Sequence, residues 1–450
     1  MRAFKYESTL EDGSLALALA PALTPTGVEK SPIFFRGIAK HPQILARGLL
    51  VLADITATRY FKYVPDAQRD PVLSAQGDRL RAECFSACNG VYARLDLLST
   101  GFEGEIGFGT TNVDIGMTLR TALTGMKQKD KFHLLIGSDG FTTSQLRPID
   151  DTLTKLEKVI HERPVQMPDR WIRALGNTAE IHRKMKPVLT LKGIQAKGFL
   201  TTLPPATGKD QSGWVTPTPT GAKLMPRPSK SSAYISGLHR LSALKRIMTH
   251  VTQITFYMLD NLEPGPSMIE LTLPDTRLTI SLTGASWQGY SGEGALLESL
   301  AQKETQEDAE KIKESLAFDA IINEKNLAEE WNISRKRVQS ALALLAVSGR
   351  VGFDASEQAY FHRELPDDPN RILKDNPRLV GAKKLVDNIT KTGKNNWIVS
   401  SQDANYLVHY EENTGAHQAK CTCTWYLNHQ NKRGPCKHIL AIQLKKDKSL

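Results

Sequence analysis

The feature that most constrains this chain is a group of three cysteines and one histidine near its C-terminus. The group reads Cys-x-Cys, then twelve residues, then Cys-x-His, and its members are Cys421, Cys423, Cys436 and His438. Zinc binds thiolate sulfur and imidazole nitrogen in a tetrahedron, and a Cys₃His set occupies all four positions. Because no position is left for water or a substrate, the spacing predicts one structural zinc ion rather than a catalytic one.

The residues around the four candidate ligands predict a small strand–strand–helix module over residues 380–450. Residues 406–410 and 419–424 have the pattern of a hairpin that ends in the Cys-x-Cys pair, whose side chains would point to one face. A Gly-Pro turn then predicts a helix start, which places Cys436 and His438 in the first turn. The alternative is that the cysteines are only small buried side chains. It is disfavoured because three of the five fall within sixteen residues.

The stretch Arg-Gly-Pro-Cys-Lys-His at 433–438, with the apolar helix after it, resembles the SWIM zinc finger, and especially that of bacterial SWIM proteins. Two upstream stretches, Phe-Phe-Arg-Gly at 34–37 and Phe-Ser-Ala-Cys-Asn-Gly at 85–90, also resemble the N-terminal half of bacterial SWIM zinc-finger family proteins. The resemblance implies zinc binding and contact with either DNA or protein. It also implies a role beside MoxR-type AAA+ ATPases and von Willebrand factor A proteins.

The chain as a whole has the composition of an ordinary soluble protein, with 40% hydrophobic and 24% charged residues. Its 450 residues are enough for roughly two to four domains. The N-terminal residues contain no apolar signal region. The most apolar stretch, at 44–55, is interrupted by Arg47 and Asp54 and is too short to span a bilayer, so it predicts a buried helix. Five cysteines without disulfide-like spacing suit a reducing compartment, and we expect a cytoplasmic protein.

The predicted fold class is α+β and multidomain, with a mixed N-terminal scaffold, a winged helix-turn-helix and the small zinc-bound ββα module. Residues 1–202 would form a mixed α/β domain, and residues 233–300 would form a β-rich segment. The Pro/Thr/Gly-rich residues 203–232 would be a linker or a surface loop between them. Helical patterns cover 41–60, 151–163 and 168–185, and strand patterns cover 131–136, 188–192, 254–258 and 268–282.

Residues 310–365 have the pattern of a winged helix-turn-helix. Apolar spacing predicts a first helix through 312–322, a short second helix, and a third helix that starts after Ser334, a good N-cap residue. Residues 350–353 and 359–362 would form the two-stranded wing.

Two interpretations of the predicted winged helix remain open. In a DNA-reading version, the third helix enters the major groove and brings Arg335, Lys336 and Gln339 to the duplex. In a protein-docking version, the same side chains are a solvated face. We favour protein contact slightly, because the predicted wing carries no basic cluster.

The zinc region is locally basic, within a chain of net charge +10. Residues 381–450 contain eleven Lys or Arg against five Asp or Glu. Lys420, Lys432, Arg433 and Lys437 would either contact phosphate or offset the negative charge of a Cys₃His zinc site.

Complete catalytic motifs are lacking in the sequence. His161-Glu162 begins like a zinc-protease motif but has no second histidine at the required spacing, and no phosphate-binding GxxxxGK[ST] loop occurs. The glycine-rich segment 101–109 is interpreted as a turn-rich loop. Cys84 and Cys88, four residues apart, would be buried thiols on one helix face.

The leading hypothesis is therefore a non-enzymatic, zinc-binding adaptor that docks a protein partner through its SWIM and winged-helix modules. One alternative is a protein that binds DNA or another nucleic acid through the basic zinc region and the helix after Ser334. Another is an enzyme with an unrecognised site in residues 1–200.

Overall fold

In a computed structural model, the chain forms two compact units. Unit 1 comprises residues 1–168, 184–289 and 317–320, and unit 2 comprises residues 169–183, 290–316 and 321–450. The structure describes residues 9–11, 14–16, 22–24, 27–29, 33–60, 71–137, 140–148, 154–163, 169–259, 263–290, 303–363, 365, 377–401, 404–411, 418–431 and 435–447.

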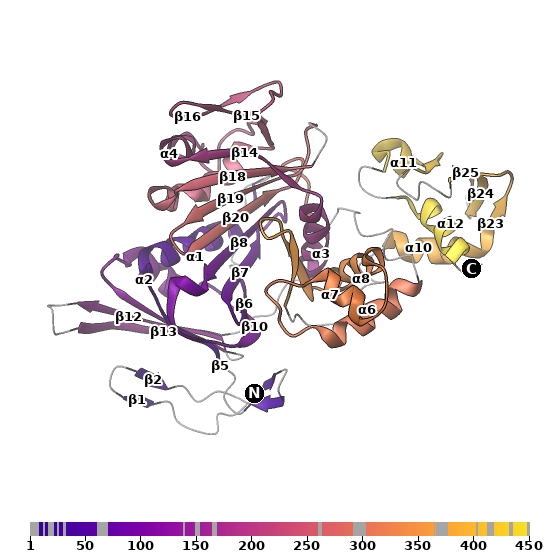
Figure 1. Ribbon diagram of the computed structural model, residues 1–450. Coiled ribbons are helices and arrows are strands. Elements are labelled where there is room, and N and C mark those ends of the chain that lie inside the picture. The colour runs from indigo at the N-terminus through magenta and orange to yellow at the C-terminus, as the bar shows by residue number, and fades with distance from the viewer. Residues whose placement is uncertain are drawn as a thin grey trace. The chain divides into compact units, whose positions relative to one another are not determined.

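Unit 1 is built on two antiparallel sheets (Figure 1). Within the described ranges, the larger sheet has eight strands in the order β10-β6-β7-β8-β20-β19-β18-β14, and the smaller has five in the order β13-β12-β11-β5-β9. The strands of the larger sheet are β6 (Val72–Gln76), β7 (Arg79–Phe85), β8 (Val91–Leu98), β10 (Phe108–Asn112), β14 (Lys186–Lys192), β18 (Gln253–Met258), β19 (Ser267–Leu273) and β20 (Thr276–Leu282). Those of the smaller are β5 (Ile33–Ala39), β9 (Phe102–Ile106), β11 (Lys131–Gly137), β12 (Gly140–Pro148) and β13 (Thr154–Glu162).

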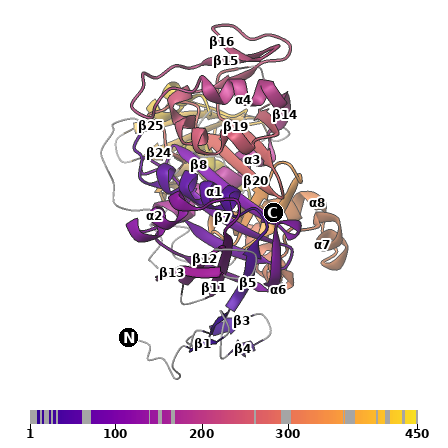
Figure 2. The same cartoon turned by 90° about the vertical axis from the view of Figure 1, so that its left-hand side faces the viewer.

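The helix α1 (Pro42–Thr56) packs against β7 and β8 (Figure 2). Proline in its first turn suits a helix start, and twelve of its fifteen residues are buried. The apolar run at 44–55 is therefore a buried core helix, as predicted. The other helices in the described part of unit 1 are α2 (Met117–Gly125), α4 (Gly193–Thr201) and the 3-10 helices η1 (Ser99–Gly101), η2 (Leu238–Arg246) and η3 (Met248–His250).

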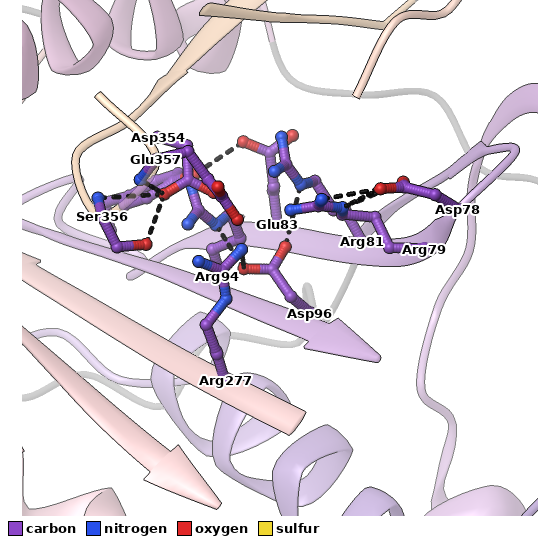
Figure 3. Close-up of polar contacts among 11 residues, drawn as sticks. Asp78, Arg79, Arg81, Glu83, Arg94, Asp96, Arg277, Asp354, Ser356 and Glu357 are labelled. Atoms are coloured by element: carbon purple, nitrogen blue, oxygen red, sulfur yellow. Dashed lines mark hydrogen bonds and ion pairs between the residues drawn. The ribbon is translucent and has the colours of Figure 1, made fainter. Parts of the chain in front are cut away.

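The polar face of the large sheet carries a buried network of charges (Figure 3). The carboxylate of Asp96 on β8 lies 2.9 Å from Nε of Arg81 on β7 and 2.9 Å from Nε of Arg94. Nη2 of Arg277, on β20, lies 3.6 Å away. Arg81, Arg94 and Asp96 are at most 1% exposed, so the carboxylate balances charges that water does not screen.

The predicted division of residues 1–300 into two domains differs from the structure. β14 pairs with β18, so one sheet contains strands from both 1–202 and 233–300. The segment 203–232, expected as a linker or loop, contains the hairpin of β15 (Gly213–Thr218) and β16 (Gly221–Met225), and β15 also pairs with β17 (Ala233–Ile235). The hairpin is packed onto β17, because Trp214 of β15 is buried and its ring contacts Tyr234.

Three local predictions in unit 1 are wrong. Residues 154–162 form the strand β13 rather than a helix, because they pair along their length with β12 and alternate in exposure at Val159, Ile160 and His161. The segment 101–109 is mostly strand, in β9 and β10. Cys84 lies in β7 and Cys88 in the turn after it, so they do not share a helix face.

Unit 2 contains a group of helices followed by a hairpin. The described helices of this group are α3 (Asp169–Arg183), α6 (Lys303–Ser315), α7 (Glu324–Glu330) and α8 (Arg335–Val347), and the hairpin strands are β21 (Val351–Asp354) and β22 (Ala359–His362). The Ser334 side chain accepts a hydrogen bond from the Arg337 N–H and caps α8, as predicted. α6 ends at Ser315, earlier than predicted, and Ile322 instead forms a strand-like bridge with Tyr360.

α3 comes from far upstream in the chain, yet it packs on α8 and β21. The Tyr360 hydroxyl donates to Oε1 of Glu180 on α3 at 2.6 Å, and Arg183 pairs with the other carboxylate oxygen at 3.0 Å. Oδ1 of Asp354 accepts hydrogen bonds from the backbone and side chain of Ser356, which fixes the turn of the hairpin (Figure 3).

The remaining elements form the C-terminal module and two short strand pairs. The module contains α10 (Pro377–Leu385), η5 (Val386–Asn388), β23 (Ile389–Lys391), β24 (Asn396–Ser401), β25 (Ala404–His409), β26 (Lys420–Cys421), α11 (Thr424–His429) and α12 (Lys437–Asp447). The short pairs are β1 (Thr9–Glu11) with β2 (Ser14–Ala16), and β3 (Ala22–Thr24) with β4 (Gly27–Glu29). None of the helices in the described ranges has both the length and the apolar character needed to cross a bilayer.

Candidate metal centre

The first two cysteines are placed by a hairpin and a helix start. β25 pairs antiparallel with β26, with Val408 opposite Cys421, so that both side chains are buried. Cys423 is the N-cap of α11, and its sulfur accepts the Tyr426 N–H at 3.4 Å. A backbone N–H pointing at sulfur favours the thiolate that a metal requires. The hairpin was predicted from the sequence, whereas α11 was not.

The third cysteine and the histidine lie at the start of α12. Cys436 directly precedes the helix, and the Ile439 N–H donates to its sulfur. His438 lies in the first turn, and its ring stacks on Tyr406 with centroids 4.1 Å apart. These contacts hold the imidazole at one orientation, with Nδ1 towards the cysteines.

The four donor atoms are close enough to share one ion. All lie within 4.8 Å of one another, and all four residues are buried. His438 Nδ1 is 3.7 Å from the Cys421 sulfur and 3.9 Å from the Cys436 sulfur. Zinc–sulfur bonds of about 2.3 Å and zinc–nitrogen bonds of about 2.0 Å, at tetrahedral angles, separate a sulfur from a nitrogen by about 3.5 Å. The residues therefore fit a four-coordinate zinc ion.

The thiols without metal share their protons unequally. Hydrogen bonding with Cys423 raises the pKa of Cys421, and hydrogen bonding with Cys421 lowers the pKa of Cys423. A hydrogen bond with Cys421 alone would lower the pKa of Cys436, but hydrogen bonding with Cys423 and burial outweigh it and raise that pKa to about 11. Three buried sulfurs cannot all ionise together unless a cation is present, and zinc supplies one.

Two of the four basic residues predicted near this site belong to the described part of the chain. Lys420, on β26, and Lys437, at the start of α12, are exposed. Lys432 and Arg433 lie outside the described residues. Arg378 of α10 makes a cation–π contact that the sequence did not predict. Its guanidinium lies 4.2 Å from the centre of the Trp425 ring. Its only sequence signal is the aromatic residue two positions after Cys423.

The polar residues predicted on α8 are largely paired with acids. Arg335 lies 3.3 Å from Oε2 of Glu324, and Gln339 donates to the same oxygen at 2.8 Å. Lys336 is exposed. Arg337, which no motif in the sequence marks, forms a two-bond pair with Asp308 at 2.7 and 2.8 Å.

A family model of the SWIM zinc finger matches residues 406–446. No curated protein matches the chain. Among solved structures, the Proliferating Cellular Nuclear Antigen from Entamoeba histolytica is similar over 56% of this chain and 98% of that chain, with 12% identity and a TM-score of 0.37. The PCNA2–PCNA3 complex from Sulfolobus tokodaii is similar over 55% of this chain and 98% of that chain, with 9% identity and a TM-score of 0.39.

The family match agrees with the geometry of the site. It begins at Tyr406, which stacks on the histidine, and it contains all four donor residues. Four ligands complete the tetrahedron, so the zinc has no open position for a substrate. Residues 406–446 are therefore a SWIM zinc finger, and Cys421, Cys423, Cys436 and His438 form its structural zinc site.

Proposed function

We propose that this protein is a non-enzymatic, zinc-binding adaptor that docks a protein partner. The docking surfaces would be the SWIM zinc finger and a winged helix formed by α6, α7, α8 and the β21–β22 hairpin. The family resemblance suggests a MoxR-type AAA+ ATPase or a von Willebrand factor A protein as the partner. None of the five cysteines is in a disulfide, which suits the expected cytoplasmic setting.

The observation that carries this proposal is the acidic pairing along α8. A helix that reads DNA needs its N-terminal polar side chains available for bases and phosphates. Here Glu324 binds both Arg335 and Gln339, and Asp308 binds Arg337. Acidic groups among these side chains repel phosphate, so the pairing favours a protein surface over a duplex.

Affinity purification of the full chain from its native host, with nuclease treatment, tests the proposal. We expect a protein partner that survives nuclease and moderate salt, and that binds again when both proteins are purified. Cys436→Ser should weaken this binding, because the finger loses a ligand and its fold. The proposal fails if nothing but nucleic acid is recovered.

A second candidate, nucleic-acid binding by the finger itself, is favoured by the exposed Lys420 and Lys437. Contacts to phosphates release counterions, so the affinity for a DNA duplex or RNA would fall steeply with salt. Lys420→Glu with Lys437→Glu should then abolish binding. Glu324→Gln is the matched variant on α8: it should leave binding by the finger unchanged, and it would strengthen binding only if α8 reads nucleic acid.

A further inference from the structure

A second cysteine site, separate from the zinc finger, lies in the loop that joins β7 to β8 in unit 1. The loop closes where the Ser86 N–H donates to the Val91 carbonyl at 2.9 Å and the Val91 N–H donates to the Ser86 hydroxyl at 3.1 Å. The Asn89 N–H bonds back to the Ser86 carbonyl at 2.7 Å. Asn89 has a left-handed φ of 60°, a conformation that asparagine tolerates better than most residues. Half-buried Cys88 is thus held on a rigid turn.

The surroundings of Cys88 favour its thiolate. Burial alone would raise its pKa, but the Ser86 hydroxyl, 3.4 Å from the sulfur, and the N–H groups of Tyr60 and Gly90 stabilise the anion. With the nearby charge of Arg240, they bring the pKa of Cys88 below its ordinary value. The contrast with Cys84 is sharp, because full burial raises the pKa of that thiol well above its ordinary value.

Arg240 supplies a fixed positive charge to this site. The residue is fully buried, and its guanidinium donates to the carbonyls of Ser236 and Thr283 at 3.0 Å each and to the carbonyl of Gly90. These bonds hold the guanidinium in place. The loop therefore holds a sulfur with directed donors, and the guanidinium of Arg240, on η2, is bonded to the loop at the Gly90 carbonyl.

Two buried side chains have polar atoms without partners among the described residues, one next to Cys88 in the loop and one bonded to Tyr60, as Cys88 is. Asn89, the next residue of the loop, is 3% exposed, and neither its Oδ1 nor its Nδ2 is hydrogen-bonded. His239, 2% exposed, is hydrogen-bonded to the backbone of Tyr60, the residue whose N–H reaches Cys88, and its Nδ1 has no partner. Buried polar groups are normally satisfied, so these atoms indicate a small molecule that both donates and accepts hydrogen bonds.

We propose that Cys88 is a peroxide-reactive thiolate, and that Asn89 and His239 bind the peroxide beside it. This site is independent of the zinc finger and of the adaptor role. The thiolate sulfur attacks one oxygen of hydrogen peroxide. The S–O bond forms as the O–O bond breaks, sulfur is oxidised to a sulfenic acid, and the leaving hydroxide takes a proton from solvent to become water.

The test uses the zinc-loaded full chain, treated with hydrogen peroxide in the presence of dimedone, which traps sulfenic acids. Peptide mass spectrometry should place the adduct on Cys88 and leave Cys84 unmodified. In a separate experiment, the rate of alkylation of Cys88 by iodoacetamide should rise with pH to a midpoint below about 8.5, the value of a free cysteine. A midpoint at or above that value, or equal labelling of both thiols, would overturn the proposal.

Asn89→Gly separates peroxide binding from thiolate formation. Glycine keeps the left-handed turn and removes the amide. The rate of sulfenic acid formation should fall about tenfold, as for one lost hydrogen bond to the reacting molecule, while the pH midpoint of alkylation stays in place. Cys84→Ala is the control and should change neither measurement. If Asn89→Gly leaves the peroxide rate unchanged, the two side chains hold only an ordered water and the peroxide site is refuted.

Discussion

Asp96 is a buried carboxylate that three arginines of unit 1 share. Its carboxylate meets Arg81, Arg94 and Arg277 on the polar face of the large sheet. Asp96→Asn keeps the shape but removes the negative charge, so three guanidinium groups lose the carboxylate charge that they share. We expect the free energy of unfolding to fall by about 3–5 kcal/mol, measured by urea denaturation.

Asp78→Asn is the matched control for that substitution. Asp78 pairs with neighbouring Arg79 at 2.6 Å, but its side chain is 46% exposed. Exposed pairs contribute at most about 1 kcal/mol, so the control should be close to wild type. If both variants lose the same free energy of unfolding, burial does not determine how much the Asp96 network stabilises the fold.

Proton release on zinc binding provides a second test at the residue scale. Hydrogen bonding and burial raise the pKa of Cys421 and of Cys436, so these thiols hold their protons near neutral pH until zinc binds. Zinc requires three thiolates and therefore displaces protons when it binds. Zinc affinity should therefore rise with pH from 5 to 8, as measured by titration calorimetry in buffers of different ionisation enthalpy. A zinc affinity that does not change with pH, with no proton release, would contradict thiolate ligation.

The zinc ligands were predictable residue by residue because their spacing is itself the signal. With Cys-x-Cys at a strand end and Cys-x-His at a helix start, few other sets of side chains could bind one zinc ion. The pairing of Glu324 with Arg335 and Gln339 was not predictable, since nothing in the sequence indicates which acid reaches which base across a turn. That the side-chain amide of Asn89 lacks hydrogen-bond partners can be known only from the folded loop.

At the scale of single elements, α8 offers a direct test of its cap. The Ser334 hydroxyl accepts the Arg337 N–H, one of the donors that a helix start leaves unsatisfied. Ser334→Ala should lower the free energy of unfolding by about 1 kcal/mol. Ser340→Ala, in the middle of the same helix, is the control and should be neutral or slightly stabilising, because alanine is the better helix former. Urea denaturation followed by circular dichroism compares the two variants.

Elements with local signals were predicted well, and those set by distant partners were not. Ser334 and the proline of α1 mark helix starts in the sequence alone. β13 has the local pattern of a helix, yet its pairing with β12 makes it a strand. The energy of pairing between strands can override the local propensity of a segment. The sequence of one strand does not show which other strand it will pair with.

At the scale of the whole molecule, the sequence could not predict which segments share a core. The large sheet joins β14 to β18 across about sixty intervening residues, and α3 leaves its sequence neighbours to pack on α8. The 203–232 segment looked like a linker by composition, but Trp214 gives it a packed hairpin. A Pro/Thr/Gly-rich composition predicts a flexible linker only where the segment has no large side chain that packs against another element.

The structural zinc is the central claim, and the zinc content of the purified full chain tests it most directly. Inductively coupled plasma mass spectrometry on protein prepared without added metal should find one zinc per chain in the wild type. Cys436→Ser, which removes one thiolate ligand, should retain less than half of it. A wild-type chain without zinc, or a variant that keeps its full share, would contradict a Cys₃His centre built from these residues.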